Sequence, residues 1–165
     1  MPDPDNSGYR AFSVVLHWLS ALLLVAMFVT HSGGEYSLLL KFHKTIGPAV
    51  GVLLLCRVLY RIRLGFPKDS TTHPRSTLDK VVIRLLLLAI VLMVVTGCLL
   101  PWARGTSLLL AGIAIPVPPF ISPLYQHTVL ITHTLSAYLL VPLLLLHIML
   151  TTRPERMFSV DSQGR

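Results

Sequence analysis

Two histidines stand fourteen residues apart within one long apolar stretch. They are His133 and His147, and no charged residue lies between them. Fourteen residues make four turns at about 3.5 residues per turn, so both imidazoles project from one helical face, roughly 21 Å apart. Imidazole is a common metal ligand, and a polar side chain in hydrocarbon is costly unless a partner satisfies it. The spacing therefore indicates two metal-binding positions along one membrane helix.

Two further histidines lie in other apolar stretches at matching depths. His17 lies about two turns inside the inner end of the first stretch, and His147 about a turn and a half from the inner end of the last. His43 opens the second stretch at the depth of His133. A haem b takes two axial imidazoles from different helices at one depth. The pairs His17/His147 and His43/His133 meet this requirement and predict two haems, stacked across a membrane for electron transfer.

Other interpretations of these histidines stay open at this point. Intramembrane histidines also form hydrogen bonds between helices without any metal. His31 is fourteen residues from His17, on the same face and at the outer depth, so spacing alone does not choose between His31 and His43. His127 precedes His133 by six residues and is turned away from that face, near the outer haem edge or the lipid headgroups.

The composition is that of an integral membrane protein. The chain has 165 residues, of which 53% are hydrophobic and 13% charged, and its mean hydropathy is +0.71. Soluble domains carry about 25% charged residues. A membrane-crossing helix needs about 20 apolar residues, and four stretches approach or exceed that length, at residues 11–30, 43–62, 81–102 and 124–152. We expect an all-α fold, a four-helix transmembrane bundle that forms a single domain over residues 1–165.

The charges predict an orientation. The net charge is +7, and eleven of the fourteen basic residues lie on the side of both termini and the link between the second and third stretches, against three on the other side. This positive-inside asymmetry places both termini in the cytoplasm and argues against nucleic-acid binding. The N-terminal leader carries two aspartates, which favours a retained helix over a cleaved signal peptide. The eleven basic residues on the side of the termini are Arg10, Arg57, Arg61, Arg63, Lys68, Arg75, Lys80, Arg84, Arg153, Arg156 and Arg165. The three basic residues on the other side are Lys41, Lys44 and Arg104.

The second outer link, residues 101–123, carries five prolines around the apolar segment LLLAGIAI. This segment is too short to cross a bilayer, so we expect an interfacial or re-entrant segment that either covers a site or only lies on the membrane.

Cys56 and Cys98 fall within spans and are expected to pack as small apolar residues. The sequence has no C-x-x-C-H motif, so any haem is not covalently attached.

Residues 9–153 resemble the bacterial cytochrome b561 family. The resemblance is carried by His17-Trp18, His43-x-x-x-Gly47, Arg57 and Arg61, Arg104-Gly105, His133 and His147. It implies that the irons of two b haems have as axial ligands His17 with His147 and His43 with His133. His31 then becomes a bystander.

Arg57 lies fourteen residues from His43 towards the inner side. A haem propionate is the expected partner of an arginine at this depth, and snorkelling to lipid phosphates is the alternative.

Four-helix members of the family without a fused soluble domain include superoxide oxidases, which pass electrons from superoxide to ubiquinone. The resemblance thus implies a superoxide:ubiquinone oxidoreductase, with superoxide oxidised on the periplasmic side. Lys41, Lys44 and Arg104 would form a positive mouth that attracts the anion. Trp102 and the proline-rich link are candidates for contact with the quinone, although interfacial anchoring also explains a tryptophan there.

Two other functions remain open from the sequence. The first is a membrane cytochrome b subunit of a dehydrogenase or hydrogenase complex, which would dock a redox partner protein. The second is a haem-free transporter or structural bundle.

Overall fold

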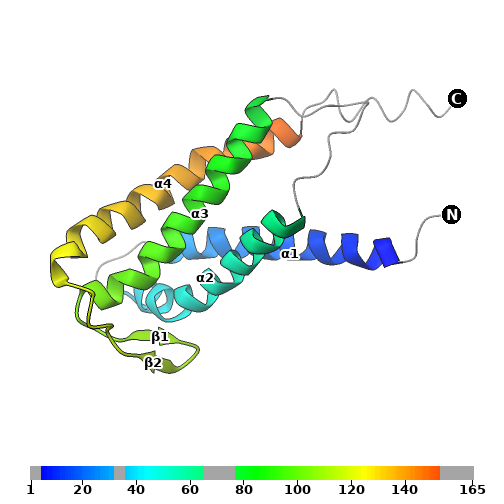
Figure 1. The fold of residues 1–165 in the computed structure, drawn as a ribbon. Coiled ribbons are helices and arrows are strands. Elements are labelled where there is room, and N and C mark those ends of the chain that lie inside the picture. The colour runs from blue at the N-terminus through cyan, green and yellow to red at the C-terminus, as the bar shows by residue number, and fades with distance from the viewer. Residues whose placement is uncertain (1–4, 32–35, 65–76, 153–165) are drawn as a thin grey trace, which may run out of the picture.

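The computed structural model describes residues 5–31, 36–64 and 77–152. Within them four helices are long and apolar enough to cross a membrane, which confirms the predicted all-α, four-span bundle. These helices run back and forth, so that the start of α1 and the end of α4 lie at the same end of the molecule (Figure 1). Their bounds are Asp5–Thr30 for α1, Leu38–Leu64 for α2, Thr77–Ala103 for α3 and Gln126–Thr151 for α4.

The helix α2 begins before the apolar run that predicts it. Its start is fixed by Ser37, whose Oγ accepts a hydrogen bond from the amide of Leu40 at 3.1 Å and whose carbonyl accepts one from the amide of Lys41 at 3.1 Å. A serine in this position satisfies amides that the first turn leaves without an intrahelical acceptor. His43 consequently lies inside the helix rather than at its first residue.

The helices pack unevenly. The most extensive pairing is between α3 and α4, while α2 packs against both α1 and α3. A small core of Met27, Val50, Leu54 and Val94 joins the first three helices. Gly51 permits the close approach of α2 to α3, because a Cβ at this position would lie 2.8 Å from Cγ1 of Val94.

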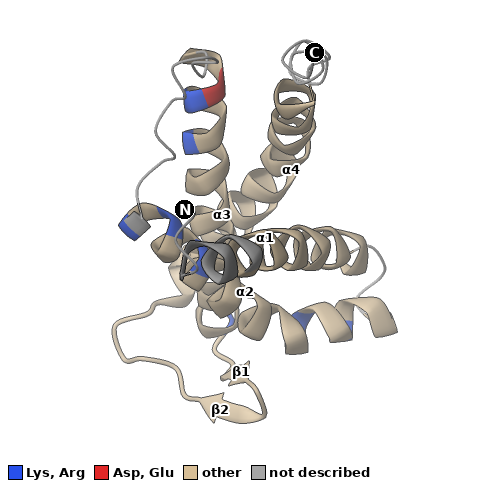
Figure 2. Ribbon diagram, turned by 90° about the vertical axis from the view of Figure 1, so that its right-hand side faces the viewer, with Lys and Arg blue, Asp and Glu red and all other residues tan. Residues whose placement is uncertain are grey.

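Large apolar side chains cover the outside of the bundle. Leu22 is 66% exposed and Met149 69% exposed. Such a surface is rare in water but ordinary in a bilayer, where lipid chains solvate it. Positions with charged residues are few on the described helices and lie mostly in the outer parts of these helices (Figure 2). The basic residues Lys68, Arg75, Arg153, Arg156 and Arg165 lie outside the described residues.

The link between α3 and α4 forms an antiparallel β-hairpin. Its strands are β1 (Leu108–Leu110) and β2 (Ile113–Ile115), with Leu108 opposite Ile115. The turn residues Ala111 and Gly112 have φ angles of 49° and 86°, as a tight two-residue hairpin turn requires. After a short 3₁₀ turn, Pro123–Tyr125, the chain enters α4.

The hairpin is fixed to the bundle at two places. Leu108 is only 5% exposed, and β1 packs against α2. The indole Nε1 of Trp102 on α3 donates a hydrogen bond to the carbonyl of Ile115 at 3.2 Å. The hairpin therefore marks one end of the bundle, the end opposite the start of α1 (Figure 1).

Candidate functional site

Two pairs of histidines face each other at different depths of the bundle. His43 on α2 and His133 on α4 have ring centroids 6.3 Å apart, with the ring planes at 74°. We call them the hairpin-side pair. His17 on α1 and His147 on α4 have centroids 6.5 Å apart, also at 74°, and form the termini-side pair. Four helix positions far apart in the sequence thus meet as two pairs.

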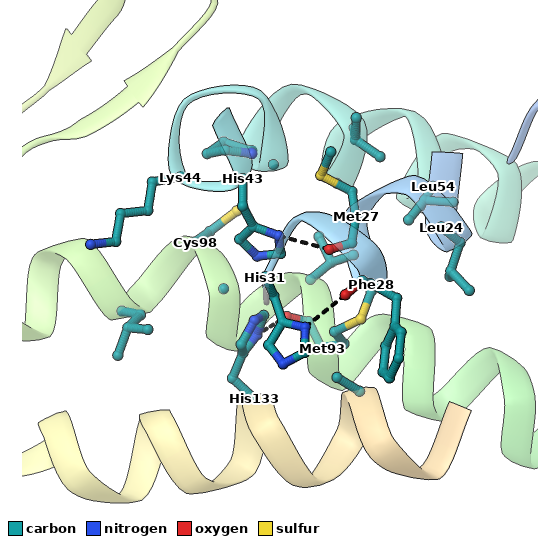
Figure 3. Close-up of a pocket in the computed structure, with 18 of the residues that line it drawn as sticks. Leu24, Met27, Phe28, His31, His43, Lys44, Leu54, Met93, Cys98 and His133 are labelled. Carbon is teal, nitrogen blue, oxygen red and sulfur yellow. Dashed lines mark hydrogen bonds between the residues drawn. The ribbon is translucent and has the colours of Figure 1, made fainter. Parts of the chain in front are cut away.

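In the hairpin-side pair, each ring is held by the backbone of a neighbouring helix. The Nδ1 of His43 is 2.9 Å from the carbonyl oxygen of Met27 on α1, and the Nδ1 of His133 is 2.9 Å from that of Met93 on α3 (Figure 3). A carbonyl only accepts, so each Nδ1 carries the hydrogen. In the neutral ring, Nε2 is then unprotonated, which is the form that binds a metal.

A cavity of about 610 Å³ surrounds the hairpin-side pair. Its wall is built from all four helices and from residues near the hairpin, and it includes both histidines together with Lys44 and Arg104. His43, His31 and His133 all project into this space (Figure 3). We call it the hairpin-side cavity.

Two glycines shape the hairpin-side cavity. At Gly47, one turn after His43, an added Cβ would meet nothing within 4 Å, so the cavity is open next to this position. At Gly97 on α3, an added Cβ would lie 2.9 Å from Cε1 of His133. The His133 ring therefore occupies its position only because residue 97 has no side chain.

In the termini-side pair, His17 contacts a charged side chain, Arg57 on α2. Nη2 of Arg57 on α2 lies 3.1 Å from Nδ1 of His17, and Nη1 donates to the carbonyl of Ser13 at 3.3 Å. A guanidinium has no acceptor, so here Nδ1 of His17 accepts and the hydrogen of the neutral ring is on Nε2. Nδ1 of His17 thus contacts a donor, whereas Nδ1 of His43 and of His133 contacts an acceptor.

The other residues that the sequence singled out are divided between the lining of the hairpin-side cavity and positions outside it. Lys44 and Arg104 line the hairpin-side cavity, whereas Lys41 is exposed one turn earlier and is not among the lining residues that the structure describes. Trp102 also lies outside that lining and holds the hairpin through its indole N–H. His127 is exposed in the first turn of α4.

His31, the sequence-level rival of His43, lines the same cavity. Its Nδ1 lies 2.6 Å from the carbonyl of Phe28 on its own helix, and its ring centroid is 6.3 Å from that of Tyr138. Of the two candidates, His43 is the one whose ring contact with His133 the structure describes. Among the cysteines, Cys98 lines the cavity and Cys56 is exposed.

The geometry fits a haem iron with two axial imidazoles. Two metal–nitrogen bonds of about 2 Å, plus roughly 1 Å from each nitrogen to its ring centre, separate the centroids by about 6 Å. Both observed separations, 6.3 and 6.5 Å, are close to this value. In the described residues no group of three or more His, Cys, Asp or Glu side chains is placed to hold a metal ion. Two histidines suffice for haem, because the porphyrin supplies the other four nitrogens.

Apolar membrane-crossing helices with imidazoles from different helices facing each other are the architecture of membrane cytochromes b. The chain belongs to the prokaryotic cytochrome b561 family, whose sequence profile matches residues 8–160. It is thus a multi-pass bacterial membrane protein that binds haem b and transfers electrons. No curated protein and no solved structure gives a significant match to the chain.

Proposed function

We propose that the protein binds two b haems, through His43 with His133 and His17 with His147, and acts as a superoxide:ubiquinone oxidoreductase. Two superoxide anions are oxidised to dioxygen, and their two electrons, with two protons, reduce one ubiquinone to ubiquinol. When bound, the two haems would serve as one-electron carriers, one near each side of the membrane. The observation that carries the proposal is the presence of two facing histidine pairs, one of them inside a cavity with a cationic rim.

The cationic rim supports an anionic electron donor. Lys44 and Arg104 are both exposed and both line the hairpin-side cavity, and Lys41 adds a third positive charge one turn away. Positive charge at the mouth of a cavity with apolar walls raises the local concentration and the association rate of an anion. These side chains attract and guide superoxide towards the hairpin-side pair. In this proposal the hairpin end faces the periplasm, and both termini lie on the cytoplasmic side of the inner membrane.

Apolar residues of α1 and α4 that line the hairpin-side cavity and are exposed support an electron acceptor that arrives from the bilayer. Several residues that line the hairpin-side cavity are also exposed on the outside of the bundle, among them Val25 on α1 and Tyr138 and Leu145 on α4. Ubiquinone is a lipid-soluble molecule that would meet these exposed apolar residues from the bilayer. The N–H of Trp102, the sequence candidate for quinone contact, is already bonded to Ile115, so Trp102 would meet a quinone through its ring face.

Arg57, next to His17 of the termini-side pair, is the proposed partner of a haem propionate. The guanidinium now donates to Nδ1 of His17. A haem held by Nε2 of His17 would require the ring hydrogen on Nδ1, which would leave Arg57 without its acceptor there. A propionate carboxylate then offers the guanidinium a bidentate partner.

The proposed activity is tested with the purified, haem-loaded protein in liposomes that contain ubiquinone. Superoxide is generated enzymatically, and ubiquinol is quantified with and without superoxide dismutase. We expect ubiquinol formation that depends on the protein and is abolished by the dismutase. If ubiquinol formation equals that of protein-free liposomes although both haems are present, the assignment of superoxide as donor and ubiquinone as acceptor is wrong.

The role of the rim is tested by removing its charges. We expect the double variant Lys44→Gln/Arg104→Gln to lower kcat/KM for superoxide about tenfold at low ionic strength, with a smaller effect at high salt because salt screens the attraction. Arg84→Gln, which removes one exposed cation from α3 away from the cavity, is the control and should leave kcat/KM unchanged. An equal loss in the control variant, or no loss in the double variant, contradicts electrostatic guidance by the rim.

A further inference from the structure

Two segments on different helices share the pattern Met-x-Val-Thr. They are residues 27–30 (MFVT) on α1 and residues 93–96 (MVVT) on α3. In each, the methionine carbonyl lies 2.9 Å from the Nδ1 of one histidine of the hairpin-side pair. The same short pattern thus lies beside each of the two imidazole rings, on α1 for His43 and on α3 for His133.

The threonine of each segment reaches the same nitrogen. The Oγ1 of Thr30 is 3.5 Å from Nδ1 of His43, and the Oγ1 of Thr96 is 3.4 Å from Nδ1 of His133. Residues three apart on a helix are neighbours on one face, so the carbonyl and the hydroxyl of each segment approach the imidazole together. Each Nδ1–H therefore has a near carbonyl and a more distant hydroxyl beside it.

The orientation of each hydroxyl follows from its other contacts. Thr30 Oγ1 donates to the carbonyls of Ala26 at 2.9 Å and Met27 at 3.1 Å. Thr96 Oγ1 donates to the carbonyls of Leu92 at 2.6 Å and Met93 at 3.2 Å. Because the single hydroxyl hydrogen is directed at the helix backbone, the oxygen lone pairs are left for the imidazole N–H. Both threonines thus act as acceptors towards the histidines.

We infer that Thr30 and Thr96 are a matched pair of positioning residues that hold Nε2 of His43 and His133 towards the cavity and lower the midpoint potential of the hairpin-side haem. The inference rests on the proposed ligation of that haem. An acceptor on Nδ1–H makes an imidazole a stronger electron donor, which stabilises the oxidised iron. At His17 the described side-chain partner of Nδ1 is instead a donor, Arg57.

The test is a potentiometric titration of the purified, haem-loaded full-length protein and its Thr30→Val, Thr96→Val and double variants. Valine keeps the branched shape and removes the hydroxyl acceptor. We expect each single variant to shift the reduction equilibrium of the hairpin-side haem roughly two- to tenfold towards the reduced form, where tenfold corresponds to about 59 mV for one electron. The double variant should shift it further, and the other haem should not change.

Thr30→Ser and Thr96→Ser are the controls, because serine keeps the hydroxyl. We expect both serine variants to have midpoint potentials near that of the wild type. Loss of the hairpin-side haem in a valine variant but not in its serine counterpart also supports the positioning role. Unchanged potentials in all valine variants, equal shifts of both haems, or equal effects of valine and serine overturn it.

His43→Ala and His133→Ala, measured in the same series, separate this inference from the proposed function. If both variants retain two haems, the proposed ligation is wrong whatever the threonine variants do. If each loses one haem while the valine variants keep wild-type potentials, only the role of the threonines is wrong.

Discussion

In the hairpin-side pair, one nitrogen of each imidazole is bonded to the backbone of a helix other than its own. His43 on α2 is fixed by Met27 on α1, and His133 on α4 by Met93 on α3. The backbone carbonyl sets the tautomer, and the tautomer leaves Nε2 available for a metal. Ring orientation in this pair therefore depends on the packing of helix pairs and not on the histidine alone.

Gly97 provides a test of this dependence at the residue scale. In Gly97→Ala the new Cβ would lie 2.9 Å from Cε1 and 3.2 Å from Nδ1 of His133, so the ring must move and lose its hydrogen bond to Met93. We expect the affinity for the hairpin-side haem to fall about 10- to 100-fold, as is typical when the support of a metal ligand is disturbed. Haem content and the reduced-minus-oxidised spectrum of the purified variant measure this loss.

Gly51→Ala is the matched control. Its Cβ would meet Cγ1 of Val94 at 2.8 Å, a clash of similar size between α2 and α3 that involves no histidine. We expect this variant to be less stable yet to keep both haems. If the two alanine variants lose the same haem to the same extent, the effect of Gly97 comes from general packing and not from the His133 ring.

At the scale of the elements, the apolar runs predicted all four helices, because a run of about 20 apolar residues has few alternatives in a membrane. The start of α2 was predicted too late, since the signal there is a single capping serine, Ser37, ahead of the run. The hairpin was not predicted as strands, because a short apolar segment such as LLLAGIAI suits a helix, a strand or an interfacial loop equally well.

The candidate site was only partly accessible from the sequence. Depth along the spans paired His17 with His147 but left His31 and His43 as alternatives for His133, and the family resemblance chose His43. The two expected pairs face each other in the structure, and their role as haem ligands stays a prediction. The carbonyl partners of His43 and His133, and the contact of Arg57 with His17, join different helices. Such contacts depend on how helices rotate and pack, which the periodicity of a single stretch does not contain.

The attachment of the hairpin by Trp102 can be tested at this same scale. Trp102→Phe removes the indole N–H that donates to Ile115, a hydrogen bond worth about 0.5–1.5 kcal/mol. We expect amide hydrogens of residues 108–115 to exchange roughly two- to tenfold faster, while the haem spectrum is kept, because Trp102 does not line the cavity. Trp18→Phe, at a tryptophan that is 64% exposed on α1, is the control. Unchanged hairpin exchange, or the same increase in the control, would show that this bond does not fix the hairpin.

At the scale of the whole molecule, the distribution of basic residues predicts how the bundle sits in the membrane. The start of α1 and the end of α4 lie at one end and the hairpin at the other (Figure 1). We expect a reporter enzyme that is active only in the periplasm to be inactive when fused after residue 165 and active when inserted between Ala111 and Gly112. The reverse pattern would place the hairpin end in the cytoplasm and remove the proposed access of superoxide to the hairpin-side cavity.

A single helix, α4, joins the two histidine pairs. The helix α4 contributes one histidine to each pair, with Pro142 between them, so the course of this one helix sets the distance between the two proposed sites. The partner histidines come from the middle of α1 and from the second turn of α2. Electron transfer across the bundle would thus follow α4.

The most direct test of this account is the haem content of the purified protein and of four single histidine-to-alanine variants, measured by reduced-minus-oxidised spectra and a haem assay. We expect two b haems per wild-type chain. His43→Ala and His133→Ala should lose the same haem, His17→Ala and His147→Ala the other, and His31→Ala should keep both. A wild-type protein with fewer than two haems, or a haem lost in His31→Ala and kept in His43→Ala, would contradict the assignment.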